Sequence, residues 1–136
     1  MDKMKAASAF EKYREQEVTM ANPAALIVML YNACIKRLKL AQKAIEKKNY
    51  EESNANLKKA QDILSELLCS LDLKYPVAGN LMALYEFMLR EIRRINASKE
   101  SEGITPLVDM LSRLRDAWVQ VEKTCRQPYE YGDIET

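Results

Sequence analysis

Histidine is absent from this 136-residue chain, and its absence narrows the chemistry that the chain can perform. Histidine is the side chain used most often as a general base and as a metal ligand. Without it, a histidine phosphotransfer bundle is excluded, and so is the usual di-iron bundle, which needs Glu-x-x-His on two helices. The glycine motifs that cradle phosphates, GxxxxGK(S/T) and GxGxxG, are missing as well. We therefore expect no enzymatic activity, no metal ion and no cofactor.

Glycine, proline and cysteine are scarce. Three glycines and four prolines in the whole chain favour long helices over sheets. Cys34, Cys69 and Cys125 lie far apart without a CxxC motif, so we predict small buried hydrophobic side chains in a reducing compartment. The first ten residues, MDKMKAASAF, lack the apolar centre of a signal peptide, and no apolar run approaches the roughly 18 residues of a membrane span. We expect a cytoplasmic protein that is not inserted in a membrane.

An excess of one charge is also lacking. The chain has 21 lysines and arginines against 20 aspartates and glutamates, and the two signs are mixed along the sequence. No basic patch emerges, so neither nucleic acid nor an anionic membrane is an expected partner. Carboxylates such as Glu51, Glu86 and Asp116 lie among basic residues at helical spacing, which is typical of solvated helix faces.

Helical periodicity is what the chain does have, and two stretches of it fill the first half. One runs from Pro23 to Lys48, with Asn22 as a cap and Pro23 in the first helical position. The next begins after Asn49, which we predict to be a cap because Glu52 follows three residues later. The link between the two stretches is very short, so we predict antiparallel neighbours.

Two further stretches fill the second half. The third follows the segment LKYPVAGN at residues 73–80, which we interpret as a helix breaker. The fourth begins at Thr105 and Pro106, interpreted as a cap followed by a first-turn proline. Apolar residues in all four stretches alternate at spacings of three and four, and the links are short. This pattern predicts an all-α protein, an antiparallel up-down four-helix bundle over residues 22–126.

Two segments fall outside the predicted bundle. Residues 1–21 contain a short amphipathic stretch followed by a polar linker, and we predict a short N-terminal capping helix there. Residues 127–136 are polar and acidic and follow the helix-breaking Pro128 closely, so we expect a mobile C-terminal tail.

The predicted helices carry more apolar residues than one core stripe needs. From Ala24 to Tyr31 every residue is apolar or aromatic, so the apolar surface surrounds the whole first helix. Ile27, Leu30 and Cys34 are expected to point into the bundle, which leaves Leu26 and Met29 as surplus. Three explanations remain open: a groove for an amphipathic helix or extended peptide, a homodimer face, or a wider core.

Four blocks of sequence narrow these alternatives: YREQEVTMANPAALIVMLYNACI, NANLKKAQDILSELLCSLD, NLMALYEFM and LRDAW. In this order and spacing they resemble the FliS family of flagellar secretion chaperones, over roughly residues 10–120. The resemblance implies a small antiparallel helical bundle with a movable N-terminal cap. It also implies binding of the disordered C-terminal segment of new flagellin in the cytoplasm, which prevents early polymerisation. Delivery to the flagellar type III export apparatus, through transient contact with an export gate component, is implied as well.

The predicted flagellin-binding residues combine the resemblance with the surplus apolar surface. They are Tyr13, Val18, Leu26, Met29, Leu30, Leu68, Leu71, Asp72, Asn80, Leu81, Tyr85 and Met88. Tyr13 and Val18 are expected to pin the N-terminal segment or to touch the client, and Asp72 and Asn80 are expected to be polar anchors. Four of the others also lie on core stripes, where a purely structural role is favoured: Leu30, Leu71, Leu81 and Met88. The alternative function is a self-associating structural bundle, a weak homodimer without a flagellin client.

Overall fold

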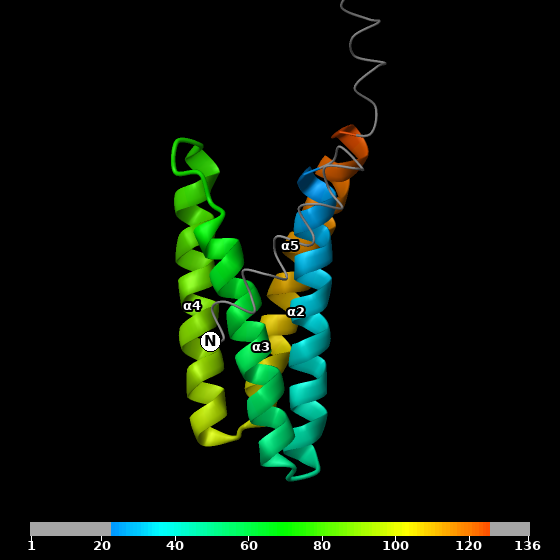
Figure 1. Cartoon of the computed structure of the whole chain (residues 1–136), viewed down its shortest axis with the longest axis vertical. Coiled ribbons are helices and arrows are strands. Elements are labelled where there is room, and N and C mark those ends of the chain that lie inside the picture. The colour runs from blue at the N-terminus through cyan, green and yellow to red at the C-terminus, as the bar shows by residue number, and fades with distance from the viewer. Residues whose placement is uncertain (1–22, 126–136) are drawn as a thin grey trace, which may run out of the picture.

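Four α-helices joined by short links make up residues 23–125, the part of the chain that the computed structural model describes. They are α2 (Pro23–Glu46), α3 (Tyr50–Cys69), α4 (Pro76–Ser98) and α5 (Ile104–Cys125), with a 3-10 turn, η1 (Ser101–Gly103), before α5 (Figure 1). The predicted capping helix in residues 1–21 and the predicted tail in residues 127–136 lie outside the described residues.

The boundary between α2 and α3 follows the predicted capping signal. The Asn49 side-chain oxygen accepts a hydrogen bond from the backbone N–H of Glu52 at 3.3 Å, and its amide nitrogen donates to the Glu52 carboxylate at 2.9 Å. The Asn49 cap is therefore confirmed, and it satisfies a backbone donor that the first turn of α3 would otherwise leave unpaired. Helix α2 ends at Glu46, two residues before the predicted end, and Lys48 turns the chain with a positive φ of 61°.

The starts of α4 and α5 differ from the prediction. Residues 76–80 belong to α4 and not to a breaker, because Pro76 occupies the first turn, where the missing N–H of proline costs no hydrogen bond. Helix α5 begins at Ile104, so Thr105 lies inside the helix and is not its cap. Instead, the Thr105 hydroxyl accepts a hydrogen bond from the Gln42 side-chain amide at 3.0 Å, which fastens the start of α5 to α2.

The helices form the predicted antiparallel four-helix bundle, but they do not pack evenly. Helix α2 packs against both α3 and α5, whereas α4 packs mainly on α3 and contacts α5 little. The α3–α4 pair and the α2–α5 pair lie close together at one end and diverge toward the other, as Figure 1 shows. We call the diverging end, where α2 begins, α5 ends and α3 turns into α4, the open end; the other is the closed end.

The core explains why α2 is apolar on nearly all sides. Because α2 has two helical neighbours, it needs two apolar faces, and Leu26 and Tyr31 are buried along with Leu30. Leu26, expected to be surplus to the core stripe, is buried in this core cluster. The largest fully buried side chains are Tyr31, Tyr85, Leu38, Leu57, Leu64, Leu67, Met88, Ile92, Ile95, Ile104, Leu107 and Leu111.

The two cysteines whose side chains are described differ in burial. Cys34 is fully buried, as predicted, but Cys69 at the end of α3 is exposed, so that part of the prediction is wrong. The side chain of Cys125 lies outside the described residues.

Among residues 23–125, no helix has the length and apolar character that crossing a bilayer requires.

Candidate functional site

An apolar pocket of about 250 Å³ lies at the open end, and all four helices contribute to it. Ile27 comes from α2 and Trp118 from α5. The other lining residues come from α3, α4 and the turn between them. The complete lining is Ile27, Leu67, Ser70, Leu71, Asp72, Tyr75, Val77, Ala78, Leu81, Tyr85 and Trp118. Since most of these side chains are apolar, the pocket suits apolar side chains of a ligand.

The turn between α3 and α4 shapes one edge of this pocket. The Asp72 side chain accepts a hydrogen bond from the backbone N–H of Lys74 at 3.2 Å, and its carbonyl accepts one from the N–H of Tyr75 at 3.1 Å. Such local hydrogen bonds are how aspartate stabilises a turn. The turn leaves Leu73, Tyr75 and Val77 largely in solvent, with exposed fractions of 66%, 59% and 56%. We call these three residues the apolar rim; exposed apolar clusters of this kind are typical of partner-binding surfaces.

Tyr85, which lines the pocket, belongs to a buried pair of tyrosines. The hydroxyls of Tyr31 on α2 and Tyr85 on α4 form a hydrogen bond, and the ring centroids are 6.4 Å apart at an angle of 52°. Burial raises the pKa of Tyr31, and the hydrogen bonds of Tyr31 with Tyr85 and Trp118 offset part of this increase. Burial is also the main reason why the pKa of Tyr85 lies well above its usual range. Both hydroxyls stay neutral near pH 7, so Tyr85 offers no charge to a ligand in the pocket.

Four of the predicted site residues meet at this pocket: Leu71, Asp72, Leu81 and Tyr85. Of these, Leu81 and Tyr85 are almost fully buried and form its inner wall, whereas Asp72 is exposed at its edge.

The other predicted residues do not line the pocket. Leu26, Leu30 and Met88 belong to the core, with exposed fractions of 7%, 3% and 0%. Met29 and Leu68 are partly buried, and Asn80 is exposed near the start of α4. Tyr13 and Val18 lie outside the described residues.

The sequence analysis missed several pocket residues. Ile27 was assigned to the core because it lies on the predicted α2 stripe, and Tyr75 and Val77 fell in the segment interpreted as a breaker. Trp118 was not singled out as a contact either, although LRDAW was one of the four matched blocks. That block was the available signal, but only the fold shows that a residue of α5 reaches the end of α3 and the start of α4.

Charged residues tie α5 to α2 beside the pocket. The Arg115 guanidinium donates a hydrogen bond from Nη1 to the side-chain oxygen of Asn32 at 3.1 Å. The same guanidinium forms an ion pair with Asp116 at 3.2 Å. Because these groups are at least partly exposed, we expect them to set the register of the two helices more than to add stability.

Known proteins provide the context for this site. A flagellar secretion chaperone FliS of Bacillus subtilis is 32% identical over 118 residues, covering 87% of this chain and 89% of that protein. The flagellar secretion chaperone FliSB of Pseudomonas aeruginosa is 30% identical over 121 residues, covering 85% of this chain and 96% of the relative. A solved bacterial flagellar chaperone superposes with a TM-score of 0.73 at 19% identity, covering 87% of this chain and 98% of the other, which supports the fold. The sequence model of the family described as "Flagellar protein FliS" matches residues 6–125. The chain therefore belongs to the FliS family, a family of flagellar secretion chaperones.

Proposed function

We propose that this flagellar secretion chaperone binds the disordered C-terminal segment of flagellin at the open end of its bundle. Binding prevents premature polymerisation, and the complex is then delivered to the flagellar type III export apparatus. The observation that carries the proposal is the apolar pocket with its exposed apolar rim, on a chain that belongs to the FliS family. The resemblance to this family supplies the identity of the client.

The physical basis of client binding is burial of apolar surface. A disordered segment that folds on a partner loses conformational entropy, which the buried area must offset at about 25 cal/mol per Å². An amphipathic client helix presents large apolar side chains three and four residues apart. One such side chain enters the pocket, and its neighbours lie on Leu73, Tyr75 and Val77. Release needs no ATP, because the client passes to the export gate.

The predicted site residues take different roles in this proposal. Leu71, Leu81 and Tyr85 contact the client directly, since they line the pocket. Asp72 is a polar anchor for the client backbone at the pocket edge, and Asn80, one turn into α4, is a second one.

A second group of predicted residues acts around the pocket. Met29 and Leu68 extend the contact surface with their partly exposed side chains. Leu26, Leu30 and Met88 support the helices from the core. In the absence of client, residues 1–21 cover the open end, with Tyr13 and Val18 as contacts.

Two exposed tyrosines provide a matched test. Tyr75 lines the pocket and has the Lys74 ammonium 5.8 Å from its ring, whereas Tyr50 lies at the closed end with the Lys99 ammonium 5.7 Å away. Isothermal titration calorimetry with a flagellin C-terminal fragment should give a one-to-one complex. Tyr75→Ala is expected to weaken it about tenfold, equal to about 1.4 kcal/mol, because an aromatic contact is lost. Tyr50→Ala should leave the affinity unchanged.

Two results would contradict the proposal. One is the absence of heat at tens of micromolar protein, which would leave no useful affinity for flagellin. The other is equal weakening by Tyr75→Ala and Tyr50→Ala, which would place the client elsewhere. Light scattering distinguishes the alternative function: a concentration-independent dimer that persists when the flagellin fragment is added would favour a self-associating structural bundle.

A further inference from the structure

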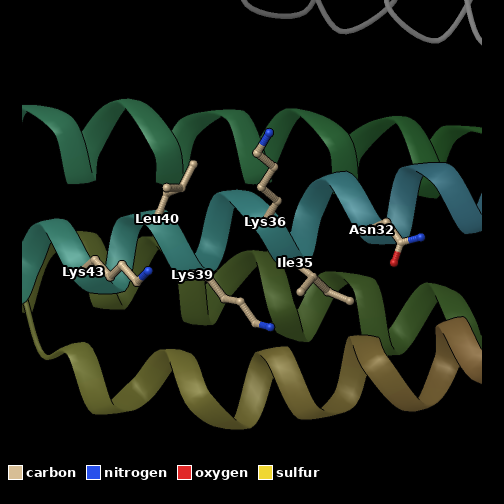
Figure 2. Close-up of a pocket in the computed structure, with 6 residues that line it drawn as sticks. All are labelled: Asn32, Ile35, Lys36, Lys39, Leu40 and Lys43. Atoms are coloured by element: carbon tan, nitrogen blue, oxygen red, sulfur yellow. The ribbon is translucent and has the colours of Figure 1, made fainter.

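The exposed face of α2 carries a row of three lysines, Lys36, Lys39 and Lys43, which we call the lysine stripe. Figure 2 shows them following one another along the helix. Together with Asn32, Ile35 and Leu40 they line a shallow depression of about 260 Å³, separate from the pocket at the open end. The stripe and the depression therefore form a second surface, one that combines positive charge with two aliphatic side chains.

The positive charge of the described residues is concentrated on α2. This helix has four basic residues and one acidic residue, Glu46, whereas the rest of residues 23–125 has twelve of each sign. None of the three stripe lysines forms an ion pair with another residue in the described range 23–125. Like charges three and four residues apart on a helix repel one another, so an anionic occupant would stabilise this face.

The chain itself contains a segment of the opposite charge. Residues 127–136, QPYEYGDIET, include Glu130, Asp133 and Glu135 and no basic residue. This segment begins two residues after Cys125, where α5 ends, with Arg126 between them; α5 is the helix that lies beside α2. We propose that residues 127–136 dock along the lysine stripe of the same molecule, with carboxylates of the segment against the lysine ammonium groups.

The distances permit this arrangement. The hydrogen bond between Arg115 and Asn32 sets the register of α5 against α2. From Arg115 to the end of α5 at Cys125 is about 15 Å along the helix, and from Asn32 to Lys39 is about 10 Å in the opposite direction, at 1.5 Å per residue. A chain returning from Cys125 must therefore span about 25 Å to reach Lys39.

The acidic residues lie at the right separation from α5 for this return. Asp133 and Glu135 follow Cys125 by eight and ten residues, which reach at most about 29 Å and 36 Å when extended. Both can therefore reach Lys36 and Lys39. Pro128 favours the return because proline disfavours continuation of α5 in its own direction.

Coupling of carboxylates to amines with a zero-length carbodiimide reagent tests the proposal on the full chain. The expected products are intramolecular links from Lys36 or Lys39 to Asp133 or Glu135, identified by peptide mass spectrometry. They should disappear at about 1 M salt, where the screening length is about 3 Å. The exposed lysines Lys58 and Lys59 on α3 are the internal control, because they lie off the stripe. Equal yields at the control lysines would overturn the proposal.

Two further measurements distinguish other occupants of the stripe. In a mixture of isotope-labelled and unlabelled protein, links that join a heavy chain to a light chain would show that a second copy supplies the acidic segment, and would overturn intramolecular docking. In NMR spectra of the full chain, the triple substitution Lys36→Gln, Lys39→Gln and Lys43→Gln should move the amide signals of residues 129–136 to those of a free peptide of the same sequence. Substitution of Lys58 and Lys59 by glutamine should not move them. Unchanged signals in the triple variant would also overturn the proposal. All these measurements omit flagellin, so their outcome is independent of the proposed client.

Discussion

The hydroxyl pair of Tyr31 and Tyr85 joins α2 to α4 beside the pocket, which Tyr85 lines. Both side chains are almost completely removed from solvent, with exposed fractions of 0% and 1%. A buried hydroxyl without a partner costs about 1–3 kcal/mol, so the Tyr31 hydroxyl removes the penalty that the Tyr85 hydroxyl would otherwise carry. The pair therefore links α4 directly to α2.

Removing one hydroxyl of this pair is predicted to lower the free energy of unfolding more than removing both. Tyr31→Phe leaves the Tyr85 hydroxyl buried without its partner, so the free energy of unfolding should fall by about 1–3 kcal/mol in urea denaturation. In the double variant Tyr31→Phe with Tyr85→Phe, part of this loss should be regained, because no unpaired hydroxyl remains. Additive losses in the two single variants and the double variant would mean that the hydroxyls do not depend on each other.

Cys34 is predicted to make the fold sensitive to alkaline pH. Burial raises the pKa of its thiol from 9.0 to about 12. Because the pKa is higher in the folded state, the contribution to stability is complete below about pH 9 and is lost as the pH rises towards 12. Tyr31 and Tyr85, whose pKa values are also raised, act in the same direction.

The measurement is the free energy of unfolding in urea between about pH 7 and pH 11. It should stay level up to about pH 9 and then decline, and Cys34→Ala should make the decline shallower than in the unmodified chain. Cys69→Ala, at an exposed cysteine, is the matched control. Identical slopes in the unmodified chain and in Cys34→Ala would show that this thiol does not contribute.

At the scale of the helices, the closed end is held by polar side chains. Gln42 on α2 donates hydrogen bonds to the Ser101 carbonyl and the Thr105 hydroxyl, both at 3.0 Å. Asn96 on α4 donates to the side-chain oxygen of Asn54 on α3 at 2.7 Å. Together with the Asn49 cap, these contacts bring polar side chains to the ends of all four helices at the closed end.

The Asn49 cap gives a prediction for one of these helix ends. Asn49→Ala removes the acceptor for the Glu52 N–H, and the free energy of unfolding should fall by about 1 kcal/mol. Asn49→Asp keeps an oxygen acceptor in the same place and should retain most of the stability. Thermal denaturation followed by circular dichroism measures both variants; equal losses would indicate that the side-chain acceptor is unimportant.

At the scale of the whole molecule, the bundle has a closed end with polar contacts between helices and an open end with the apolar pocket. The α3–α4 turn, with its apolar rim, lies at the diverging end in Figure 1. We infer that client binding restrains mainly the open end. The pocket lining lies near the start of α2, the end of α3, the start of α4 and the end of α5.

Hydrogen–deuterium exchange with and without the flagellin fragment tests this division. Client binding should slow amide exchange in residues 67–85, because the bound segment restrains the turn and the first turns of α4. Residues 42–57 at the closed end should exchange at an unchanged rate and provide the internal control. Protection spread evenly over both ends would show that the whole bundle tightens, and would contradict a site confined to the open end.

The sequence by itself determined the helical class, the antiparallel arrangement and the boundary at Asn49. Helical periodicity, capping residues and short links are local properties, written in residues close together along the chain. The resemblance to the FliS family likewise rested on contiguous blocks such as NLMALYEFM. For this reason the fold could be predicted before any packing was known, apart from the first turns of α4 and α5.

Only the tertiary structure decided which apolar residues form the core and which line the pocket. Leu26 is buried in the core, and Ile27 packs against the core and also lines the pocket. The sequence did not distinguish the two residues, because α2 has apolar residues all round and only its neighbours determine which side is covered. The meeting of Tyr31 with Tyr85 and the contribution of Trp118 to the pocket join residues of different helices. How these helices lie against one another results from packing between residues far apart in sequence, which periodicity along a single helix does not specify.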